Sequence, residues 1–412
     1  MQPWHHLFRH ALLTAVLVLV ATASHAQGTV VAVGSSVRDD NDAVWGRLIE
    51  LAGGQGAKFA VFTAPAGDPD GAAKAIIASL TRRGAVGEHV RVGPLIEGQD
   101  LAAAVRDPAW VAQVDAAQGV YFSGGQQARL IDTLRPSGAD SPLLDAVMRL
   151  FARGGVVAGE SAGAAVMSEL IFLAPSQDVL SLMKRPLREG QDIGRGFGLI
   201  RHDVVVDQHL IRRGRIGRLM ALMQQKDKPL GLGIEEHTAV VVRGDEVEVV
   251  GDRGVLVVDF TDARRDPALG AFNVRGARLS LLDHGDRYHL GTRRMTPAAS
   301  KQSGRLDVAR PDFAGRPGVD HAFFNDMLAD NMMVTALSRL VDQGHRQVMG
   351  LSFVTQPAAT DTRPDLGFEW RLALTPASTA YRQRPDRYTI GEVELDIVPV
   401  SLQRPLYTPY RR

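Results

Sequence analysis

Residues 156–166 of the chain read VVAGESAGAAV. The apolar run at 156–158 is typical of a buried strand, and the small residues from 164 onward suit a helix. Between them lies Gly159-Glu160-Ser161-Ala162-Gly163, a G-x-S-x-G elbow in which a sharp strand-to-helix turn exposes a nucleophilic serine. A side chain at either glycine would collide with the neighbouring strand or helix. The segment therefore predicts Ser161 as a nucleophile, and a helix N-cap serine is the alternative.

The chain on the amino side of this elbow alternates short β-branched runs with stretches of helical spacing, as in βα units around a parallel sheet. It predicts a doubly wound, mostly parallel α/β sheet. Catalytic groups gather at the carboxyl ends of strands in such sheets, so residues 123–125 should lie near Ser161. Expected strands span 30–33, 59–62, 90–92, 120–122 and 156–158, and expected helices span 43–51, 71–82, 127–134 and 143–153.

The chain beyond the elbow continues with strand-like runs and a change of character near residue 296. Strands are expected at 204–206, 239–242, 247–250 and 255–258, and a hairpin at 277–282 with 288–290. We expect a catalytic domain over 27–295, followed over 296–412 by a Pro- and Gly-rich linker and a small C-terminal α+β extension. Its elements should be a helix near 323–341 and strands at 348–354, 368–374, 388–390 and 393–400.

The amino-acid composition and the first residues limit the possible classes and locations of the protein. Lys and Arg number 47 against 46 Asp and Glu, so no global field favours nucleic acid or a membrane surface. Residues 1–26 read as a signal peptide, with an apolar run shorter than a membrane span and a small-x-small cleavage site ending at Ala26. An uncleaved anchor is the alternative. We expect an exported, periplasmic or extracellular protein without a stable membrane anchor and, having no cysteine, without disulfides.

Two blocks downstream offer partners for the serine. Asp207-Gln208-His209 follows a strand-like run, where a neutral imidazole could accept the serine proton, and a structural histidine is the alternative. Glu235 or Glu236 could orient that histidine, although paired acids are also common in turns. Four arginines crowd the stretch after the histidine. A solvated basic face is one reading of them, while their density favours a carboxylate-binding site: they are Arg212, Arg213, Arg215 and Arg218.

Four blocks, taken in order, resemble the cyanophycinases of peptidase family S51. They are GGQQ at 124–127, GESAGA at 159–164, DQH at 207–209 with the arginines at 213, 215 and 218, and GIEEHTA at 233–239. The resemblance covers residues 28–292. It implies a class I glutamine amidotransferase-like fold with a serine at the elbow, and it implies no metal or cofactor.

The resemblance also assigns roles. Ser161 would be the nucleophile, His209 the general acid/base and Glu236 the orienting acid, because the family's glutamate stands immediately before x-Thr-Ala. Backbone N–H groups near Gly125 and Ala162 would form the oxyanion hole. The residues implied to line the substrate site are Gln127, Asp207, Gln208, Arg213, Arg215 and Arg218.

The substrate of that family is cyanophycin, a poly-aspartate with arginine on each β-carboxylate, and its cleavage releases β-Asp-Arg dipeptides. The resemblance thus implies a serine-type exopeptidase that forms an acyl-enzyme on cyanophycin or another Asp/Arg peptide. Its arginines would clamp carboxylates, and Asp207 would meet a guanidinium. This chain departs from the family pattern at Gln126, Glu160 and Glu235. Glu160 matters most, since an acid beside the nucleophile would add a polar contact or disfavour an anionic substrate.

Other functions stay open on the sequence alone. An aspartyl dipeptidase of the same fold would act on short Asp-X peptides and ignore the polymer. An α/β-hydrolase esterase normally orders its triad Ser, acid, His and would need a histidine such as His345. A catalytically inactive exported peptide-binding protein would use the same charges without chemistry. A homodimer is left open as well.

Overall fold

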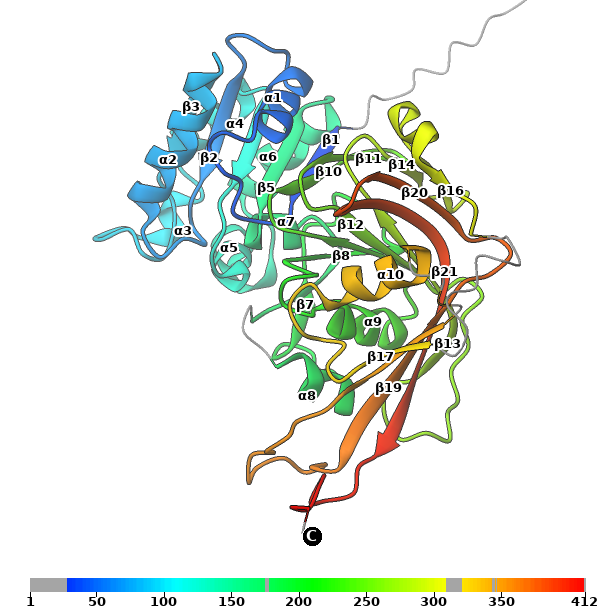
Figure 1. The fold of residues 1–412 in the computed structure, drawn as a ribbon. Coiled ribbons are helices and arrows are strands. Elements are labelled where there is room, and N and C mark those ends of the chain that lie inside the picture. Colours follow the sequence, from blue (N-terminus) through cyan, green and yellow to red (C-terminus); the bar gives the residue numbers. More distant parts are fainter. Residues whose placement is uncertain (1–27, 175–177, 309–320, 343–344, 346, 411–412) are drawn as a thin grey trace, which may run out of the picture.

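The computed structural model describes residues 28–174, 178–308, 321–342, 345 and 347–410 (Figure 1). The predicted signal peptide, residues 1–26, lies outside the described residues. Two large sheets with accompanying helices make up the fold, which confirms the prediction of a mixed α/β protein. Within the described ranges, no helix has the length and apolar character needed to cross a membrane.

The first sheet has nine strands, of which the five from β1 to the β3 edge run parallel. Antiparallel strands extend it on the other side of β1. In order across the sheet, the strands are β15 (Arg294–Thr296), β14 (Arg287–His289), β11 (Glu246–Gly251), β10 (Thr238–Arg243), β1 (Thr29–Val33), β5 (Val156–Glu160), β4 (Gly119–Phe122), β2 (Lys58–Phe62) and β3 (Val86–Val90).

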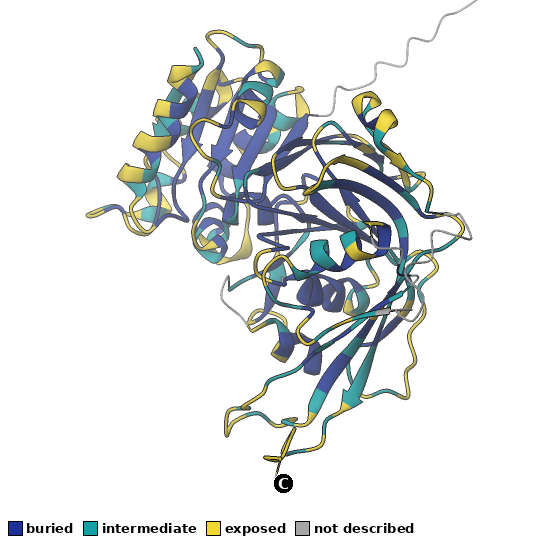
Figure 2. Cartoon of the chain, viewed as in Figure 1, coloured by how far each residue is buried: buried dark blue, intermediate teal, exposed yellow. Residues whose placement is uncertain are grey.

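Helices cover both faces of the parallel part, and this is why its strands are apolar on both sides (Figure 2). On one face Val31 shares a hydrophobic cluster with Leu48 and Leu80. On the other face Val30 shares a cluster with Val147. The helices of this half are α1 (Asp42–Leu51), α2 (Pro69–Arg82), α3 (Leu101–Ala104), α4 (Pro108–Ala116), α5 (Gln127–Leu134), α6 (Pro142–Ala152) and α7 (Ala162–Ala165), with the 3-10 turn η1 (Pro136–Gly138).

The second sheet has ten strands and is mostly antiparallel, with parallel pairing of β8 to β9 and of β17 to β18. Its main path runs β17 (His321–Phe324), β18 (Gln347–Ser352), β19 (Leu366–Ala373), β21 (Arg387–Ser401), β13 (Val274–Leu282), β12 (Val255–Asp259), β9 (Leu230–Ile234) and β8 (Val204–Gln208), with β16 (Arg305–Leu306) and β20 (Thr379–Arg384) attached beside β21. Elsewhere lie the pair β6 (Leu170–Phe172) and β7 (Ile193–Arg195), the helices α8 (Val179–Lys184), α9 (Ile216–Gln225) and α10 (Met332–Asp342), and η2 (Ala299–Gly304).

Strands from both sides of the predicted boundary at 295/296 share this second sheet, because β21 pairs with β13 along most of its length. A buried polar cluster reinforces the junction. Lys301 lies 2.8 Å from a carboxylate oxygen of Asp286 and donates to the hydroxyl of Thr389 at 3.0 Å. The segment after residue 295 is therefore built into the same sheet as β8 and β9, which carry site residues.

Several elements differ from those expected. The hairpin of 277–282 with 288–290 is wrong, because β13 pairs with β12 and β21 whereas β14 pairs with β11 and β15 of the other sheet. The helix expected from 323 begins only at Met332, since residues 321–324 form β17. Strand β9 was not expected. Its Gly231 and Gly233 weaken strand propensity, yet a Cβ at Gly233 would lie 2.1 Å from Leu210 Cδ2.

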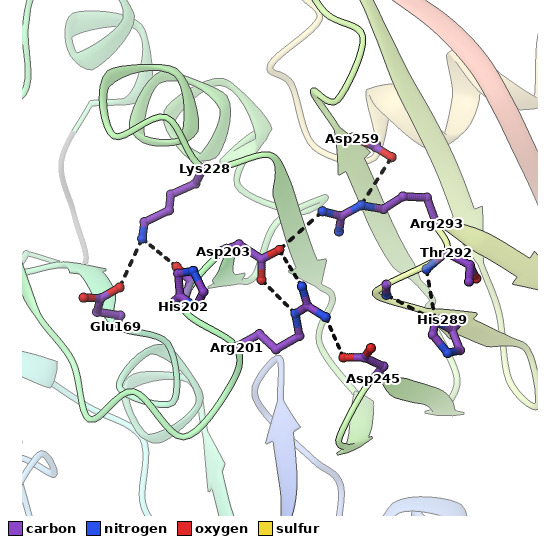
Figure 3. A network of polar contacts seen from close by, with 11 residues as sticks. Glu169, Arg201, His202, Asp203, Lys228, Asp245, Asp259, His289, Thr292 and Arg293 are labelled. Carbon is purple, nitrogen blue, oxygen red and sulfur yellow. Dashed lines mark hydrogen bonds and ion pairs between the residues drawn. The ribbon is translucent and has the colours of Figure 1, made fainter.

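A charge network ties the two sheets together at the end where β8 begins (Figure 3). Arg201 binds Asp203, the residue before β8, and reaches Asp245 in the turn between β10 and β11 at 2.7 Å. Arg293, after β14, lies 3.4 Å from Asp203 and 4.0 Å from Asp259 of β12. Because β8 is anchored at this end, its carboxyl end is placed reproducibly beside β9 and the site described next.

Candidate active site

Ser161 occupies a sharp turn between β5 and α7. Its φ is 50°, a left-handed conformation that is rare and strained for a residue with a side chain. Backbone packing enforces the turn: a Cβ at Gly159 would lie 2.7 Å from the backbone of Gly163, and one at Gly163 would lie 2.4 Å from the carbonyl oxygen of Phe122 in β4. Both glycines are thus required by sterics, as the sequence predicted, and the serine projects at a strand end.

The structure brings the predicted triad residues together from both sheets. Ser161 Oγ lies 3.0 Å from His209 Nε2, and His209 Nδ1 lies 2.7 Å from Glu236 Oε1. The serine follows β5 of the first sheet, whereas the histidine follows β8 and the glutamate follows β9 of the second. The chain from hydroxyl to imidazole to carboxylate is the geometry in which a base activates a serine and an acid orients the base.

The two adjacent glutamates make different contacts. Glu236 binds the imidazole with one oxygen and accepts from Arg212 Nη1 with the other, at 3.0 Å. Glu235 instead accepts from the backbone N–H groups of Ile211 and Arg212 at 2.6 and 3.0 Å. Glu235 therefore holds the loop that carries the histidine, while Glu236 holds the imidazole ring. The sequence did not predict the contact of Arg212 with Glu236, because its only signal there is the position of Arg212 in the arginine cluster.

Burial and nearby charges tune the imidazole. Burial lowers the pKa of His209 to about 4, with Arg213 and Arg215 lowering it further and the hydrogen bond to Glu236 opposing them. Burial alone would raise the pKa of Glu236, but the hydrogen bond to His209 and the charges of Arg212 and Arg213 outweigh it and hold that pKa below its usual value. At neutral pH the pair is therefore a neutral imidazole against an ionised carboxylate, the state a general base requires.

Two backbone N–H groups beside Ser161 are left without backbone or side-chain acceptors in the part of the chain that the structure describes. They belong to Ala162, the first residue of α7, and Gly125. The N–H of Ser161 itself donates to the carbonyl oxygen of Val33 at 3.0 Å. Gly125 has φ 138°, and a Cβ there would lie 2.1 Å from the Pro65 carbonyl oxygen, so only glycine fits this loop.

Four of the predicted substrate residues form a buried charged cluster behind the histidine. Asp207 accepts from Nε and Nη2 of Arg218 at 2.7 and 2.6 Å. Arg215 donates to the carbonyl oxygen of Gln208 at 2.9 Å and also to its side-chain oxygen. The guanidinium that Asp207 meets is therefore the one on Arg218. Arg213, in contrast, is exposed.

Two buried polar atoms of the predicted substrate residues, one in this cluster and one on α5, have no hydrogen-bond partner among the described residues. They are Nη1 of Arg218 and Oε1 of Gln127, and both are buried. The two side chains meet at Phe172, since Gln127 donates to its carbonyl oxygen at 2.6 Å and the guanidinium of Arg218 lies 4.4 Å from its ring centroid. One buried donor and one buried acceptor are thus left without a partner among the described residues, which is costly in a protein interior.

Glu160 ends β5 directly before the nucleophile and is only partly buried. Desolvation raises its pKa, and the backbone N–H groups of Gly124 and Val37 oppose that rise. Gln126 precedes α5 and makes no side-chain cap hydrogen bond. His345, the histidine that an esterase triad would need, is buried after α10, whereas the hydrogen-bond partner of Ser161 is His209. In the described ranges, no group of three or more His, Asp or Glu residues is arranged to hold a metal ion.

A strained elbow serine, hydrogen-bonded to a histidine that is itself bound by a glutamate, has the geometry that serine-type hydrolases use. Residues 89–250, which contain all three, match the sequence model of peptidase family S51. This match confirms the predicted resemblance to that family over residues 89–250 of the 412-residue chain.

Two of those relatives are cyanophycinases. The chain is 36% identical over 200 residues to the cyanophycinase of Trichormus variabilis, covering 47% of this chain and 63% of that protein. It is 34% identical over 186 residues to the cyanophycinase of Geminocystis herdmanii, covering 43% and 65%. The chain thus spans slightly less than two thirds of the length of these relatives. A crystal structure of a peptidase from an acI-B1 Actinobacterium is similar with a TM-score of 0.45 and 25% identity, covering 56% of this chain and 90% of that one.

Proposed function

We propose that this protein is an exported serine peptidase that hydrolyses cyanophycin to β-Asp-Arg dipeptides through Ser161, His209 and Glu236. The observation that carries the proposal is the hydrogen-bonded chain from Ser161 Oγ through the imidazole to the glutamate, with steps of 3.0 and 2.7 Å. The cyanophycinases among its relatives supply the substrate class. The proposal includes a class I glutamine amidotransferase-like, doubly wound catalytic region, supported by five parallel strands with helices on both faces.

In the first half of the reaction Ser161 Oγ attacks a backbone carbonyl of the poly-aspartate while His209 Nε2 takes the serine proton. Glu236 keeps Nδ1–H directed toward its carboxylate and stabilises the imidazolium that forms. The oxyanion is bound by the N–H groups of Gly125 and Ala162, which have no competing acceptor among the described residues. The imidazolium then protonates the leaving amine, and the bond between the carbonyl carbon and that nitrogen breaks to leave an acyl-enzyme.

In the second half, water gives its proton to the same imidazole and attacks the acyl carbonyl, and Ser161 leaves with the returned proton. Substrate binding is assigned to the unsatisfied atoms of Arg218 and Gln127 and to the exposed Arg213. The first offers N–H to a carboxylate, the second accepts from a guanidinium or amide, and the third provides a cation at the entrance. Asp207, Gln208 and Arg215 hold this surface from behind.

A digestion assay tests the proposal. Wild-type protein should release β-Asp-Arg from cyanophycin, identified by mass spectrometry, and Ser161→Ala should release none while keeping its thermal unfolding midpoint. Turnover by Ser161→Ala at the wild-type rate would remove this serine from the mechanism. Cleavage of short Asp-X peptides with no action on the polymer would replace cyanophycinase by an aspartyl dipeptidase. Failure of a fluorophosphonate probe to label Ser161 in folded protein would favour the inactive binding protein.

Export is a separate part of the proposal and rests on the signal-like residues 1–26. Protein recovered from the periplasm or medium of an expressing cell should begin at Gln27 by amino-terminal sequencing. Intact protein beginning at Met1 and confined to the membrane fraction would contradict it and support an uncleaved anchor.

A further inference from the structure

The carboxylate of Glu160 stands beside the reacting centre without being part of the triad. Glu160 ends β5 and directly precedes the nucleophile. A Cβ placed on Gly124 would lie 3.4 Å from Ser161 Cβ and 3.7 Å from Glu160 Cγ, so the two side chains flank the same glycine. Because Gly124 has no side chain, nothing from this position separates the glutamate from the serine. The side chains of Glu160 and of the nucleophile are therefore neighbours across Gly124.

Glu160 has hydrogen-bond donors but no cation. The N–H groups of Gly124 and Val37 face its carboxylate, while burial disfavours its charged form. Every other acid of the site is paired or serves a structural role: Asp207 with Arg218, and Glu236 with His209 and Arg212. Among the ion pairs of the described residues, Glu160 takes part in none. A desolvated carboxylate stabilised by two amides alone gains substantially when a cation binds it.

The positive and negative groups of the site therefore lie on different elements. Of the arginines near His209 and α9, Arg213 is exposed, while Arg218 is paired with Asp207 and keeps one donor atom without a partner among the described residues. The free anion lies on the side of β5, next to the oxyanion loop. Cations on one side and an anion on the other suit a ligand that carries both a carboxylate and a basic group, and not a purely acidic peptide.

We propose that Glu160 binds the guanidinium of a substrate arginine that adjoins the scissile bond, and so selects basic side chains at this position. The proposal rests on the proposed function and names the group that one subsite of that function recognises. A guanidinium would form two parallel hydrogen bonds with the carboxylate and neutralise it. A neutral side chain would leave an unpaired negative charge beside the oxyanion that forms during acylation, which slows that step.

The test compares synthetic oligomers of β-Asp-Arg with matched oligomers in which each arginine is replaced by citrulline, a neutral side chain of the same shape. The wild-type protein should show a kcat/KM for the arginine oligomer about 10- to 100-fold higher than for the citrulline oligomer. In Glu160→Gln that ratio should fall close to one, with hydrolysis of the citrulline oligomer unchanged or faster. Glutamine preserves the shape and an acceptor for the Gly124 and Val37 N–H groups, so a merely structural role would leave the ratio unaltered.

Labelling of Ser161 by a fluorophosphonate separates this proposal from the proposed function. If wild-type protein hydrolyses neither oligomer, the proposed substrate is wrong, yet stronger protection of Ser161 by the arginine oligomer than by the citrulline oligomer, lost in Glu160→Gln, would still support the cation subsite. An unchanged preference in Glu160→Gln, with wild-type labelling rate and unfolding midpoint, would overturn it. Equal protection by both oligomers in the wild-type protein would overturn it as well.

Discussion

Ser161 and His209 reach the same point from different sheets and by different physical means. The serine is fixed by backbone contacts, because Gly159 and Gly163 pack where no side chain fits. The histidine is fixed by charge, through Glu236 on its ring and Glu235 on its loop. Steric placement does not depend on pH, whereas placement by carboxylates and arginines does. The comparison predicts that substitutions at the elbow glycines destabilise the fold. Substitutions or pH changes around His209 should instead lower the catalytic activity.

The largest effect should come from removing the base. His209→Ala should lower kcat by about 10⁴- to 10⁶-fold without changing the unfolding midpoint much, because no other group accepts the serine proton. His345→Ala is the control and should keep wild-type kcat on cyanophycin. An active His209→Ala together with an inactive His345→Ala would show that His345 is the base. The triad would then follow the order Ser, acid, His that α/β-hydrolases use.

The two glutamates should separate orientation of the ring from support of the loop. Glu236→Gln should lower kcat by about 10³- to 10⁴-fold, since an amide no longer stabilises the imidazolium. Glu235→Gln keeps an oxygen for the Ile211 and Arg212 N–H groups, so its kcat should stay within about tenfold of wild type. A greater loss of kcat in Glu235→Gln than in Glu236→Gln would reverse the two assignments.

On the nucleophile side, the expected damage is to folding. A methyl group at position 163 would lie 2.4 Å from the Phe122 carbonyl oxygen, so Gly163→Ala should lower the free energy of unfolding by about 2–4 kcal/mol. Gly46→Ala is the matched control, because a Cβ there meets no atom within 4 Å and lies in helix α1. It should stabilise the protein by about 0.5–1 kcal/mol. Urea unfolding of both variants measures the difference. If Gly163→Ala were as stable as the wild-type protein, the backbone around the elbow would be able to move and accommodate the methyl group.

The smallest effect should be a shift in pH dependence. The base must be neutral, and the pKa of His209 is lowered to about 4, so kcat/KM should hold across mildly acidic pH and fall only as pH drops through about 4. Arg213→Ala removes a cation that lowers this pKa, so the acid limb should move to higher pH. Arg106→Ala, exposed after α3, should leave the profile in place. An acid limb near the ordinary histidine value in wild-type protein would contradict the burial that lowers the pKa.

Local patterns predicted the elbow half of the molecule well because its elements follow one another along the chain. Four of the five parallel strands and the predicted helices of this half lie within a few residues of their expected positions, and β3 ends where its strand was expected to start. The positions of Ser161 and His209 could be anticipated, since each follows a strand-like run, whereas the choice of Glu236 over Glu235 came from the family resemblance. Strand β9 could not be predicted, because its alternating glycines lower its strand propensity. These glycines make room for Leu210 and Met223, which lie outside the strand and give no signal in its local sequence.

Long-range pairing explains the remaining differences. Nothing local in residues 277–290 states that β13 stays in the second sheet while β14 crosses to the first. The ion pairs could not be predicted from the sequence either. The sequence shows that Asp207 is acidic and that Arg218 is basic, but not that they neutralise each other. The contact of Arg212 with Glu236 likewise depends on where β9 ends relative to the loop after β8.

The long strand β21 gives the molecule an order of assembly. β21 covers the open edge of β13, and β13 in turn holds β12 and then β9, the strand that delivers Glu236. Nucleophile and oxyanion loop can form from residues before 166, but the sheet that carries the general base is complete only once residues 387–401 have been added. Such distant pairing slows folding. A chain translated only through β13 would have a formed elbow, but the sheet that places His209 and Glu236 would be incomplete. The unpaired edge of β13 would then be prone to intermolecular pairing.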